Sequence, residues 1–301
     1  MEIAVTGASG LIGSALIAAL EADGHRVRRF VRGGVAVPGS VVWDPIAGTI
    51  EAGALDGVEA VVHLAGEGIG EKRWSLEQKE RIRSSRALGT SLIARSVAAM
   101  AQPPRALLSA SAIGWYGNRG DEVLTEASGP PQPSEFLSEV CVDWEASTAP
   151  STDAGIRTVL LRTGIVLTPK GGALGRMITP FRLGLGGKIA SGKQWMSWIS
   201  LEDEIGAIRH VLGDDSVSGP VNLTAPTPVT NLDFTKALGG AVHRPTILPT
   251  PLAPLKLALG SELVTALLVN GQRVVPAALE ASGYKFKHPD IDSAFASLLA
   301  K

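Results

Sequence analysis

Glycines stand at positions 7, 10 and 13 of this 301-residue chain, in the segment TGASGLIG. The segment follows an apolar run typical of a buried parallel strand and leads into the apolar spacing of a helix. Such a junction directs the helix's free N–H groups and positive dipole end at the turn, which favours a pyrophosphate. Gly7 would permit the tight turn, Gly10 the close approach of phosphate, and Gly13 the packing of helix on strand. The pattern predicts a dinucleotide site, with a glycine-rich turn lacking a ligand as the alternative.

The cofactor preference depends on the end of the next strand, predicted over residues 26–31. In dinucleotide folds, an acidic side chain about 20 residues beyond the turn binds the ribose 2′-hydroxyl, whereas an arginine suits a 2′-phosphate. Arg32 stands at this position, with Arg28 and Arg29 before it and no acid nearby. This arrangement favours NADP(H) over NAD(H), and an ordinary solvated arginine cluster is the alternative.

Small residues follow the strand predicted over residues 59–64, where a backbone can lie against the cofactor ribose. His63 within that strand is interpreted as a packed core histidine rather than a catalytic base. A long helix predicted over residues 77–100 places Lys79, Arg83 and Arg86 on one face. Two interpretations are open. The three side chains form a solvated basic stripe, or Arg86 points toward the cofactor cleft.

A further core strand from residue 106 delivers its carboxyl end to SASAIGWYG, residues 109–117. Parallel α/β sheets place their chemistry at this end, so Ser109, Ser111 and Tyr116 are candidates for contacting substrate or nicotinamide. A turn rich in serine and glycine needs no function, which is the alternative. The predicted cofactor-binding residues are Thr6, Gly7, Ser9, Gly10, Leu11, Ile12, Gly13, Arg32, Leu64, Ala65, Gly66, Arg86, Ser109 and Gly164.

A glycine-rich loop over residues 184–200 contains two lysines and two tryptophans, Lys188, Lys193, Trp195 and Trp198. Aromatic side chains supply contact area and lysines meet anionic groups, so the loop is predicted to cap a substrate. An edge loop with its tryptophans packed on the core explains the same residues equally well.

The composition indicates a globular protein with a small-molecule partner. Hydrophobic residues make up 45% of the chain, and the net charge of −1 with scattered lysine and arginine argues against a nucleic-acid partner. A single cysteine, Cys141, excludes an internal disulfide and a cysteine-based metal cluster, and is interpreted as a packed thiol. With one cysteine and no metal-binding motif recognised, we expect no metal site. No signal peptide or membrane span is recognised either, so we expect no membrane partner and a cytoplasmic location.

The order of elements predicts an α/β protein with a Rossmann-type doubly wound parallel sheet and a smaller C-terminal, substrate-side domain. The dinucleotide-binding domain is expected to span residues 1–165, with residues 196–224 returning to it. Residues 166–301 would form the smaller domain, because prolines punctuate the chain beyond residue 226.

These motifs resemble the extended, sugar-nucleotide epimerase type of the short-chain dehydrogenase/reductase superfamily, through TGASGLIG, VVHLAG, ALLSASAIGWYG and WISLEDE. More closely, the chain resembles an atypical subfamily of epimerase family proteins with a C-terminal domain of unknown function. The matching segments run along the whole chain: HLAGEGIGEKRWS, SSRALGT, SASAIGWYG, FLSEVCVDWE, LRTGIVL, PFRLGLGG, QWMSWIS, NLTAP and GQRVVP.

The departure from the superfamily lies in the acid/base residues. The resemblance implies a Tyr, activated by a Lys four residues later, that exchanges a proton with the substrate oxygen. The corresponding helix is EFLSEVCVDWE, which puts Phe136 and Val140 at these two positions. Neither side chain can carry a proton. Arg86 likewise stands where the family's NVxGT pattern has Asn.

Two classes of function are consistent with this sequence. The first is an NADP(H)-dependent oxidoreductase or epimerase whose acid/base has been rebuilt, acting on a small molecule that is anionic or a nucleotide sugar. Tyr116 is the preferred acid/base, because a phenol near a cationic group can have a lowered pKa, and Ser111, Glu139 or a loop lysine are alternatives. The second is a catalytically silent NADP(H)-binding sensor or scaffold. The sequence leaves the substrate and the oligomeric state open.

Overall fold

The computed structural model describes residues 1–33 and 39–300. Its central feature is an eight-stranded sheet in the order β12-β8-β6-β5-β1-β2-β3-β4. All neighbouring strands in it are parallel except β3 and β4. Its strands are β1 (Glu2–Thr6), β2 (Arg26–Arg32), β3 (Ser40–Asp44), β4 (Thr49–Ile50), β5 (Ala60–His63), β6 (Ala106–Ala112), β8 (Arg157–Thr163) and β12 (Gly219–Leu223). The predicted doubly wound α/β class is confirmed.

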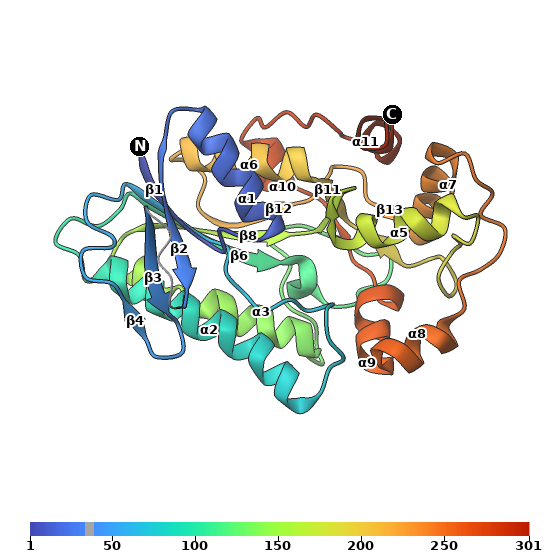
Figure 1. The fold of residues 1–301 in the computed structure, drawn as a ribbon, viewed down its shortest axis with the longest axis horizontal. Coiled ribbons are helices and arrows are strands. Elements are labelled where there is room, and N and C mark those ends of the chain that lie inside the picture. The colour runs from blue at the N-terminus through green and yellow to red at the C-terminus, as the bar shows by residue number, and fades with distance from the viewer. Residues whose placement is uncertain (34–38, 301) are drawn as a thin grey trace.

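Helices cover both faces of this sheet (Figure 1). One face carries α1 (Leu11–Ala22) and α6 (Leu201–Gly213), and the other carries α2 (Leu76–Ala98), α3 (Phe136–Ala146) and α4 (Ala149–Asp153). Because both faces are covered, the central strands are continuously apolar: Ile3, Ala4 and Val5 are fully buried. Alternate residues of β1 therefore enter two cores, one shared with α1 and α6 and one shared with α2.

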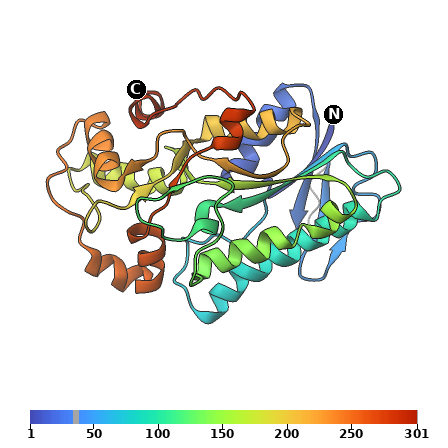
Figure 2. The same cartoon turned by 180° about the vertical axis from the view of Figure 1, so that it is seen from behind.

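A second, smaller core lies at the end of the molecule opposite β2 and β3 (Figure 2). Its centre is an edge-to-face pair, Phe234 and Phe295, with ring centroids 5.2 Å apart. Around it lie β9 (Ile165–Thr168), α5 (Gly172–Arg182), β10 (Trp195–Met196), β11 (Trp198–Ser200), β13 (Val229–Thr230), α7 (Asn231–Ala241) and α11 (Ile291–Leu298).

The remaining elements connect the two cores: a one-turn helix (Ile113–Tyr116), β7 (Val123–Leu124), α8 (Leu252–Leu259), α9 (Ser261–Val264), a following turn (Thr265–Val269), β14 (Arg273–Val274) and α10 (Ala277–Ala281). β7 pairs with β14, so the C-terminal segment is held beside the loop that follows β6. After β11 the chain returns to the main sheet through α6 and β12. The predicted domain boundaries stay a prediction.

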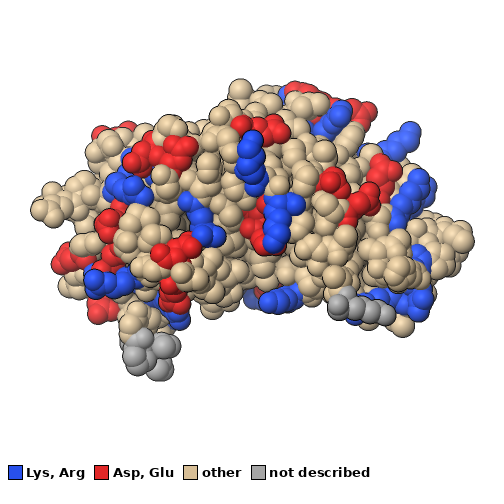
Figure 3. Space-filling model, turned by 90° about the horizontal axis from the view of Figure 1, so that it is seen from above, with Lys and Arg blue, Asp and Glu red and all other residues tan. Residues whose placement is uncertain are grey.

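Basic and acidic side chains are interspersed over the face seen in Figure 3. Among the helices in the described part of the chain, none combines the length and hydrophobicity needed to cross a membrane.

A buried carboxylate fastens the C-terminal segment to the main sheet. Asp203, in the first turn of α6, is 2% exposed. It accepts hydrogen bonds from the backbone N–H groups of Lys287 (2.7 Å) and His288 (2.9 Å) and from the Ser200 hydroxyl (3.0 Å). The Tyr284 hydroxyl lies 3.2 Å from the same carboxylate. Four donors on one buried anion compensate for its desolvation.

We expect Asp203→Asn to destabilise the protein by about 2 kcal/mol or more, because the amide replaces one acceptor oxygen by a donor that faces other donors. Chemical denaturation monitored by circular dichroism measures the change. Asp233→Asn is the matched control, since Asp233 also lies in the first turn of a helix but at an exposed site. Equal losses for the two variants would contradict the anchoring role of Asp203.

Candidate functional site

The predicted dinucleotide turn is too tightly packed for a side chain at Gly7 or Gly13. Gly7 has φ +68°, and a Cβ there would lie 2.8 Å from the Leu64 carbonyl carbon. A Cβ on Gly13 would overlap the Gly7 carbonyl oxygen, closer than real Cβ atoms approach. Gly10 is exposed and directly precedes α1, and no side chain caps the helix. The first-turn N–H groups thus face an open turn, which fits a pyrophosphate.

The Thr6 hydroxyl ties this turn to the loop after β5. Its oxygen accepts from the N–H groups of Leu64 (3.0 Å) and Ala65 (3.2 Å), so its own proton goes to His63 Nδ1 at 2.8 Å. His63 is fully buried, and burial lowers its pKa to about 4. It is therefore neutral at pH 7 with the proton on Nε2, and the prediction of a core histidine is confirmed.

Arg32 occupies the carboxyl end of β2 as predicted, and its side chain is exposed. The two arginines before it are engaged elsewhere, since Arg28 pairs with Glu2 and Arg29 with Glu21. Within residues 1–33 and 39–300, Arg32 forms no ion pair. Arg32 is thus the one of these three neighbouring arginines whose guanidinium is not engaged in an ion pair with a described residue.

Arg86 lies beside the residues that follow β5. Its Nη1 donates to the carbonyls of Glu67 (2.9 Å) and Ile82 (3.0 Å), and its guanidinium lies over the Trp144 ring at 4.8 Å. A Cβ on Gly66 would be 3.4 Å from the guanidinium carbon. Burial lowers the pKa of Arg86, and the attraction of the Glu67 side chain only partly opposes this effect. Within the described residues, no carboxylate lies at ion-pair distance from the guanidinium. Such a cation suits an electron-rich ligand group.

The rest of the basic stripe on α2 forms partly exposed ion pairs. Lys79 pairs with Glu262 of α9 at 2.6 Å, and Arg83 pairs with Glu139 of α3 at 3.0 Å. These side chains keep contact with solvent, as the interpretation of a solvated stripe describes, but they also connect α2 to α3 and α9. The pairing with Arg83 and a hydrogen bond from Ser134 lower the pKa of Glu139, so this acid alternative is ionised at neutral pH.

A buried ion pair organises the wall that carries the catalytic candidates. Arg162 of β8 donates to both oxygens of Glu145 of α3, at 2.8 and 2.9 Å. The Ser111 hydroxyl donates to the same carboxylate at 2.6 Å. The three groups are buried and satisfied, so Ser111 is held rather than free to exchange a proton.

Tyr116 belongs to the same network. It is fully buried, and its hydroxyl donates to Asn222 Oδ1 at 2.7 Å and accepts from Arg162 Nη1 at 3.0 Å. The expected lowering of its pKa is wrong. Burial raises the pKa of Tyr116, and the attraction of Arg162 only partly opposes this effect. Tyr116 is therefore held, like Ser111, in a buried hydrogen-bond network.

Two other predicted residues lie inside the sheet or tight against it. Ser109 is fully buried within β6 beside His63 of β5. Gly164 directly follows β8, and a Cβ there would lie 2.6 Å from the Ser197 carbonyl oxygen. Cys141 is buried, and burial raises its pKa to about 12, which makes it an unreactive packed thiol.

The two residues that the resemblance aligns with the superfamily's proton-carrying pair, Phe136 and Val140, are apolar and lie on α3. Phe136 packs edge-on against Trp74 with centroids 5.1 Å apart, and Lys79 Nζ lies 4.3 Å from the Phe136 centroid. Val140 is buried in α3. The start of α3 is thus an aromatic wall without a titrating phenol.

The residues of the glycine-rich loop differ in whether they fit the capping loop or the edge loop packed on the core. Trp198 is fully buried in the smaller core, as the edge-loop alternative describes, and does not cap a substrate. Trp195 is partly exposed, donates to Asp121 at 2.7 Å and lies under the Arg273 guanidinium at 4.4 Å. Lys193 is exposed, and the Lys188 backbone pairs with Thr250.

Glu204 is a candidate that the sequence did not reveal. It is 1% exposed in the first turn of α6, where it accepts a hydrogen bond from the Thr163 hydroxyl at 2.9 Å. Burial raises the pKa of Glu204 to about 8. Three consecutive acids at a helix start look like ordinary dipole-stabilising residues, so only packing distinguishes this one.

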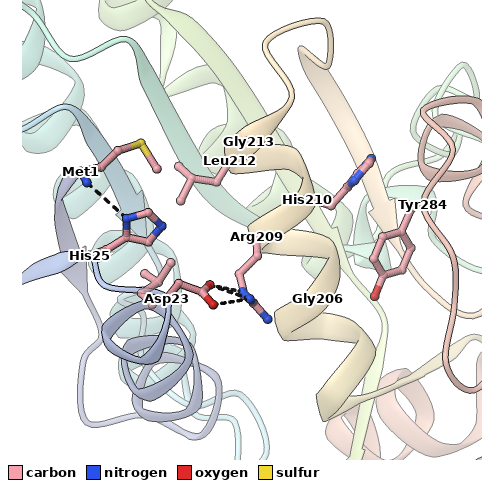
Figure 4. Close-up of a pocket in the computed structure, with 10 residues that line it drawn as sticks. Met1, Asp23, His25, Gly206, Arg209, His210, Leu212, Gly213 and Tyr284 are labelled. Atoms are coloured by element: carbon pink, nitrogen blue, oxygen red, sulfur yellow. Dashed lines mark hydrogen bonds and ion pairs between the residues drawn. The ribbon is translucent and has the colours of Figure 1, made fainter.

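A separate pocket of about 350 Å³ lies between α1 and α6, at the amino end of β1 (Figure 4). The ion pair between Asp23 and Arg209 lines it, together with His25, His210 and Tyr284. None of the predicted site residues lines this pocket. It belongs to the edge of the sheet opposite the glycine turn.

Comparisons with known proteins show which family this fold belongs to. A family model described as the NAD dependent epimerase/dehydratase family matches residues 3–223, and a domain of unknown function, DUF1731, matches residues 250–298. Epimerase family protein MT2273 of Mycobacterium tuberculosis is 46% identical over 292 residues, covering 97% of this chain and 95% of that protein.

Two solved structures extend the comparison. Human epimerase family protein SDR39U1 with NADPH has a TM-score of 0.91 at 34% identity and covers 99% of both chains. A nucleoside-diphosphate sugar epimerase from Corynebacterium glutamicum has a TM-score of 0.82 at 39% identity. The match covers 99% of this chain but 58% of that longer one.

We expect Gly13→Ala to destabilise the protein by about 1–3 kcal/mol, because the new methyl group pushes α1 away from the Gly7 carbonyl. Thermal and chemical denaturation measure the loss. Gly240→Ala is the control, since a Cβ at that helical position of α7 meets nothing within 4 Å and should stabilise by up to about 1 kcal/mol. A neutral Gly13→Ala would refute the close packing of this turn.

We expect the Tyr116 phenol to stay protonated up to at least about pH 10, its ordinary pKa, because burial opposes the phenolate. Ultraviolet titration of the unmutated protein against Tyr116→Phe isolates its tyrosinate absorbance. The variant should also lose about 1–3 kcal/mol of stability, since Asn222 and Arg162 each lose a partner. A tyrosinate that forms near neutral pH and disappears in the variant would restore the catalytic assignment.

Proposed function

This chain belongs to the NAD-dependent epimerase/dehydratase family, and we propose that it is an NADP(H)-dependent oxidoreductase or epimerase with a non-standard active site. The observation that carries the cofactor assignment is the exposed Arg32 at the carboxyl end of β2, next to a turn whose glycines leave room for a pyrophosphate. The NADPH in the solved human SDR39U1 supports the same cofactor.

The residues of this chain divide the work of binding. The glycine turn and the first N–H groups of α1 would hold the pyrophosphate, Arg32 the 2′-phosphate, and Leu64 to Gly66 the ribose. Arg86 would supply a cation beside that ribose, because its guanidinium forms no ion pair within the described residues, although Glu67 attracts it at longer range. When bound, the nicotinamide supplies hydride transfer.

The substrate is proposed to be a small anionic molecule of the nucleotide-sugar class. The name of the Corynebacterium relative, a nucleoside-diphosphate sugar epimerase, supports this class. Within this chain, the exposed Lys193 and the stacked pair of Arg273 and Trp195 offer positive charge and aromatic area for such a ligand. A cytoplasmic location stays a prediction from the sequence.

A catalytically silent NADP(H)-binding sensor or scaffold is the second candidate. Two features support it: the resemblance aligns Phe136 and Val140 with the superfamily's proton-carrying pair, and the buried network satisfies Ser111 and Tyr116. We favour the enzyme, because a basic and aromatic surface remains available for a ligand.

Turnover distinguishes the two candidates. The purified protein with NADPH or NADP⁺ should convert at least one member of a panel of carbonyl compounds and nucleotide sugars, followed by absorbance at 340 nm and by product analysis. Cofactor binding without any turnover across the panel would leave the sensor as the function.

We expect Arg32→Asp to remove the preference for NADPH over NADH. The new carboxylate repels a 2′-phosphate but accepts hydrogen bonds from a 2′-hydroxyl, so NADPH affinity should fall by about tenfold or more. Titration calorimetry with both cofactors measures the ratio. Arg26→Asp is the control, because Arg26 is exposed at the opposite end of the same strand. Equal affinities for NADPH and NADH in the unmutated protein would refute the assignment.

A further inference from the structure

Glu204 is a buried carboxyl group with an incomplete set of partners. Its Oε1 accepts from the Thr163 hydroxyl at 2.9 Å, and no hydrogen-bond partner within the described residues reaches its Oε2. The side chain is 1% exposed, although the first turn of a helix usually leaves acids in water. A half-satisfied buried acid calls for a physical explanation.

The location of this acid supplies one. Thr163 ends β8 and directly precedes Gly164, so it lies at the carboxyl edge of the sheet. Its side chain points to the face that carries α1 and α6, whereas Arg162 points to α3 on the other face. The glycine turn leads into α1 on that same face. Thr163 and Glu204 therefore share a face and an edge with the dinucleotide turn.

The strand order places them at one end of the bound dinucleotide. In a doubly wound sheet the dinucleotide crosses the point where strand order reverses, here between β1 and β5. Arg32 on β2 marks the adenosine side, so the nicotinamide side lies over β5, β6 and β8. β8 is three strand spacings from β1, about 14 Å. Thr163 at the end of β8 therefore lies on the nicotinamide side of this edge, and the Glu204 carboxyl lies on the same side beneath it.

The charged groups around Glu204 are committed to other partners. On α6, Asp203 holds the C-terminal segment and Glu202 pairs at the surface with Lys287. On the C-terminal segment, burial raises the pKa of Tyr284, and His288 Nδ1 lies 2.9 Å from the Ser200 hydroxyl. The α1 residues in the core shared with α6 are apolar.

We propose, on the basis of the proposed NADP(H) function, that Glu204 compensates the charge of the nicotinamide ring. It stays protonated beside the uncharged reduced ring and ionises beside the positively charged oxidised ring. Binding of NADP⁺ therefore releases a proton from the protein, and binding of NADPH does not. Glu204 makes the site favour oxidised cofactor more strongly as the pH rises.

The sign follows from linkage. Burial raises the pKa of Glu204 to about 8, so the acid is mostly neutral in the ligand-free protein at pH 7. A cation within about 4–6 Å lowers a carboxyl pKa by 1–3 units, so the NADP⁺ complex holds fewer protons. Its affinity then rises with pH between the two pKa values, by up to about tenfold per pH unit. NADPH brings burial without ring charge, so its affinity does not rise.

Titration calorimetry in buffers of different ionisation enthalpy counts the protons exchanged when each cofactor binds. In the unmutated protein at pH 7, we expect up to about one more proton released with NADP⁺ than with NADPH. The ratio of the two dissociation constants should change about three- to tenfold between pH 6 and 8. The 2′-phosphate is common to both cofactors, so its titration cancels in the comparison.

Three variants isolate the carboxyl group. Glu204→Gln keeps the shape and neutral charge of the protonated acid and should abolish the difference in proton release. Thr163→Val removes the hydrogen bond that lowers the Glu204 pKa and should move the pH midpoint upward. Glu202→Gln, an exposed acid two residues away, is the matched control and should behave like the unmutated protein.

Equal proton release with both cofactors in the unmutated protein would overturn the inference. A difference that survives in Glu204→Gln would overturn it as well. In both cases the cofactors still bind, so the proposed function stands. Failure of either nucleotide to bind at all would instead overturn the proposed function, and the role of Glu204 with it.

Discussion

The cofactor end of this molecule depends on one threonine hydroxyl. Thr6 is the last residue of β1. Its hydroxyl oxygen accepts hydrogen bonds from two backbone N–H groups of the chain after β5, and its O–H donates a hydrogen bond to the buried His63. These bonds fix the glycine turn against a neighbouring strand without a large side chain, so Gly7 can approach the Leu64 carbonyl closely. The neutral state of His63, which burial enforces, is what allows its Nδ1 to accept. A binding surface for phosphate is thereby built from backbone alone.

Charges inside the protein are treated in two different ways. Arg162 and Glu145 are paired and fully hydrogen-bonded, and together they hold Ser111 and Tyr116 in a rigid wall. Arg86 forms no ion pair within the described residues, although Glu67 attracts it at longer range, and Glu204 is a mostly neutral acid with one oxygen that lacks a hydrogen-bond partner there. A paired and hydrogen-bonded buried ion specifies structure, whereas a buried polar group with an unfilled partner can gain free energy when a ligand arrives. This contrast separates the scaffold of the site from the groups that respond to its contents.

The resemblance aligns Phe136 and Val140 with the superfamily's proton-carrying pair, and the structure gives this alignment a physical setting. Phe136 and Trp74 form an aromatic wall at the start of α3. The hydroxyl predicted to replace the phenol, that of Tyr116, is stabilised in its protonated form by burial. Cofactor binding and proton transfer place different demands on such a fold: the first uses strand ends and a helix terminus, and the second needs one titrating side chain in the right place.

The sequence by itself determined the doubly wound sheet, the glycine turn, the position of Arg32 and the core assignment of His63. Local periodicity and the steric demands of a tight turn depend on residues that are close together in the sequence. Tertiary structure decided that Trp198 is core, that Lys79 and Arg83 are paired, that Tyr116 has a raised pKa, and that Glu204 is a buried acid. Burial and partners set these properties, and they come from elements distant in the chain, as with Thr163 and Glu204, 41 residues apart.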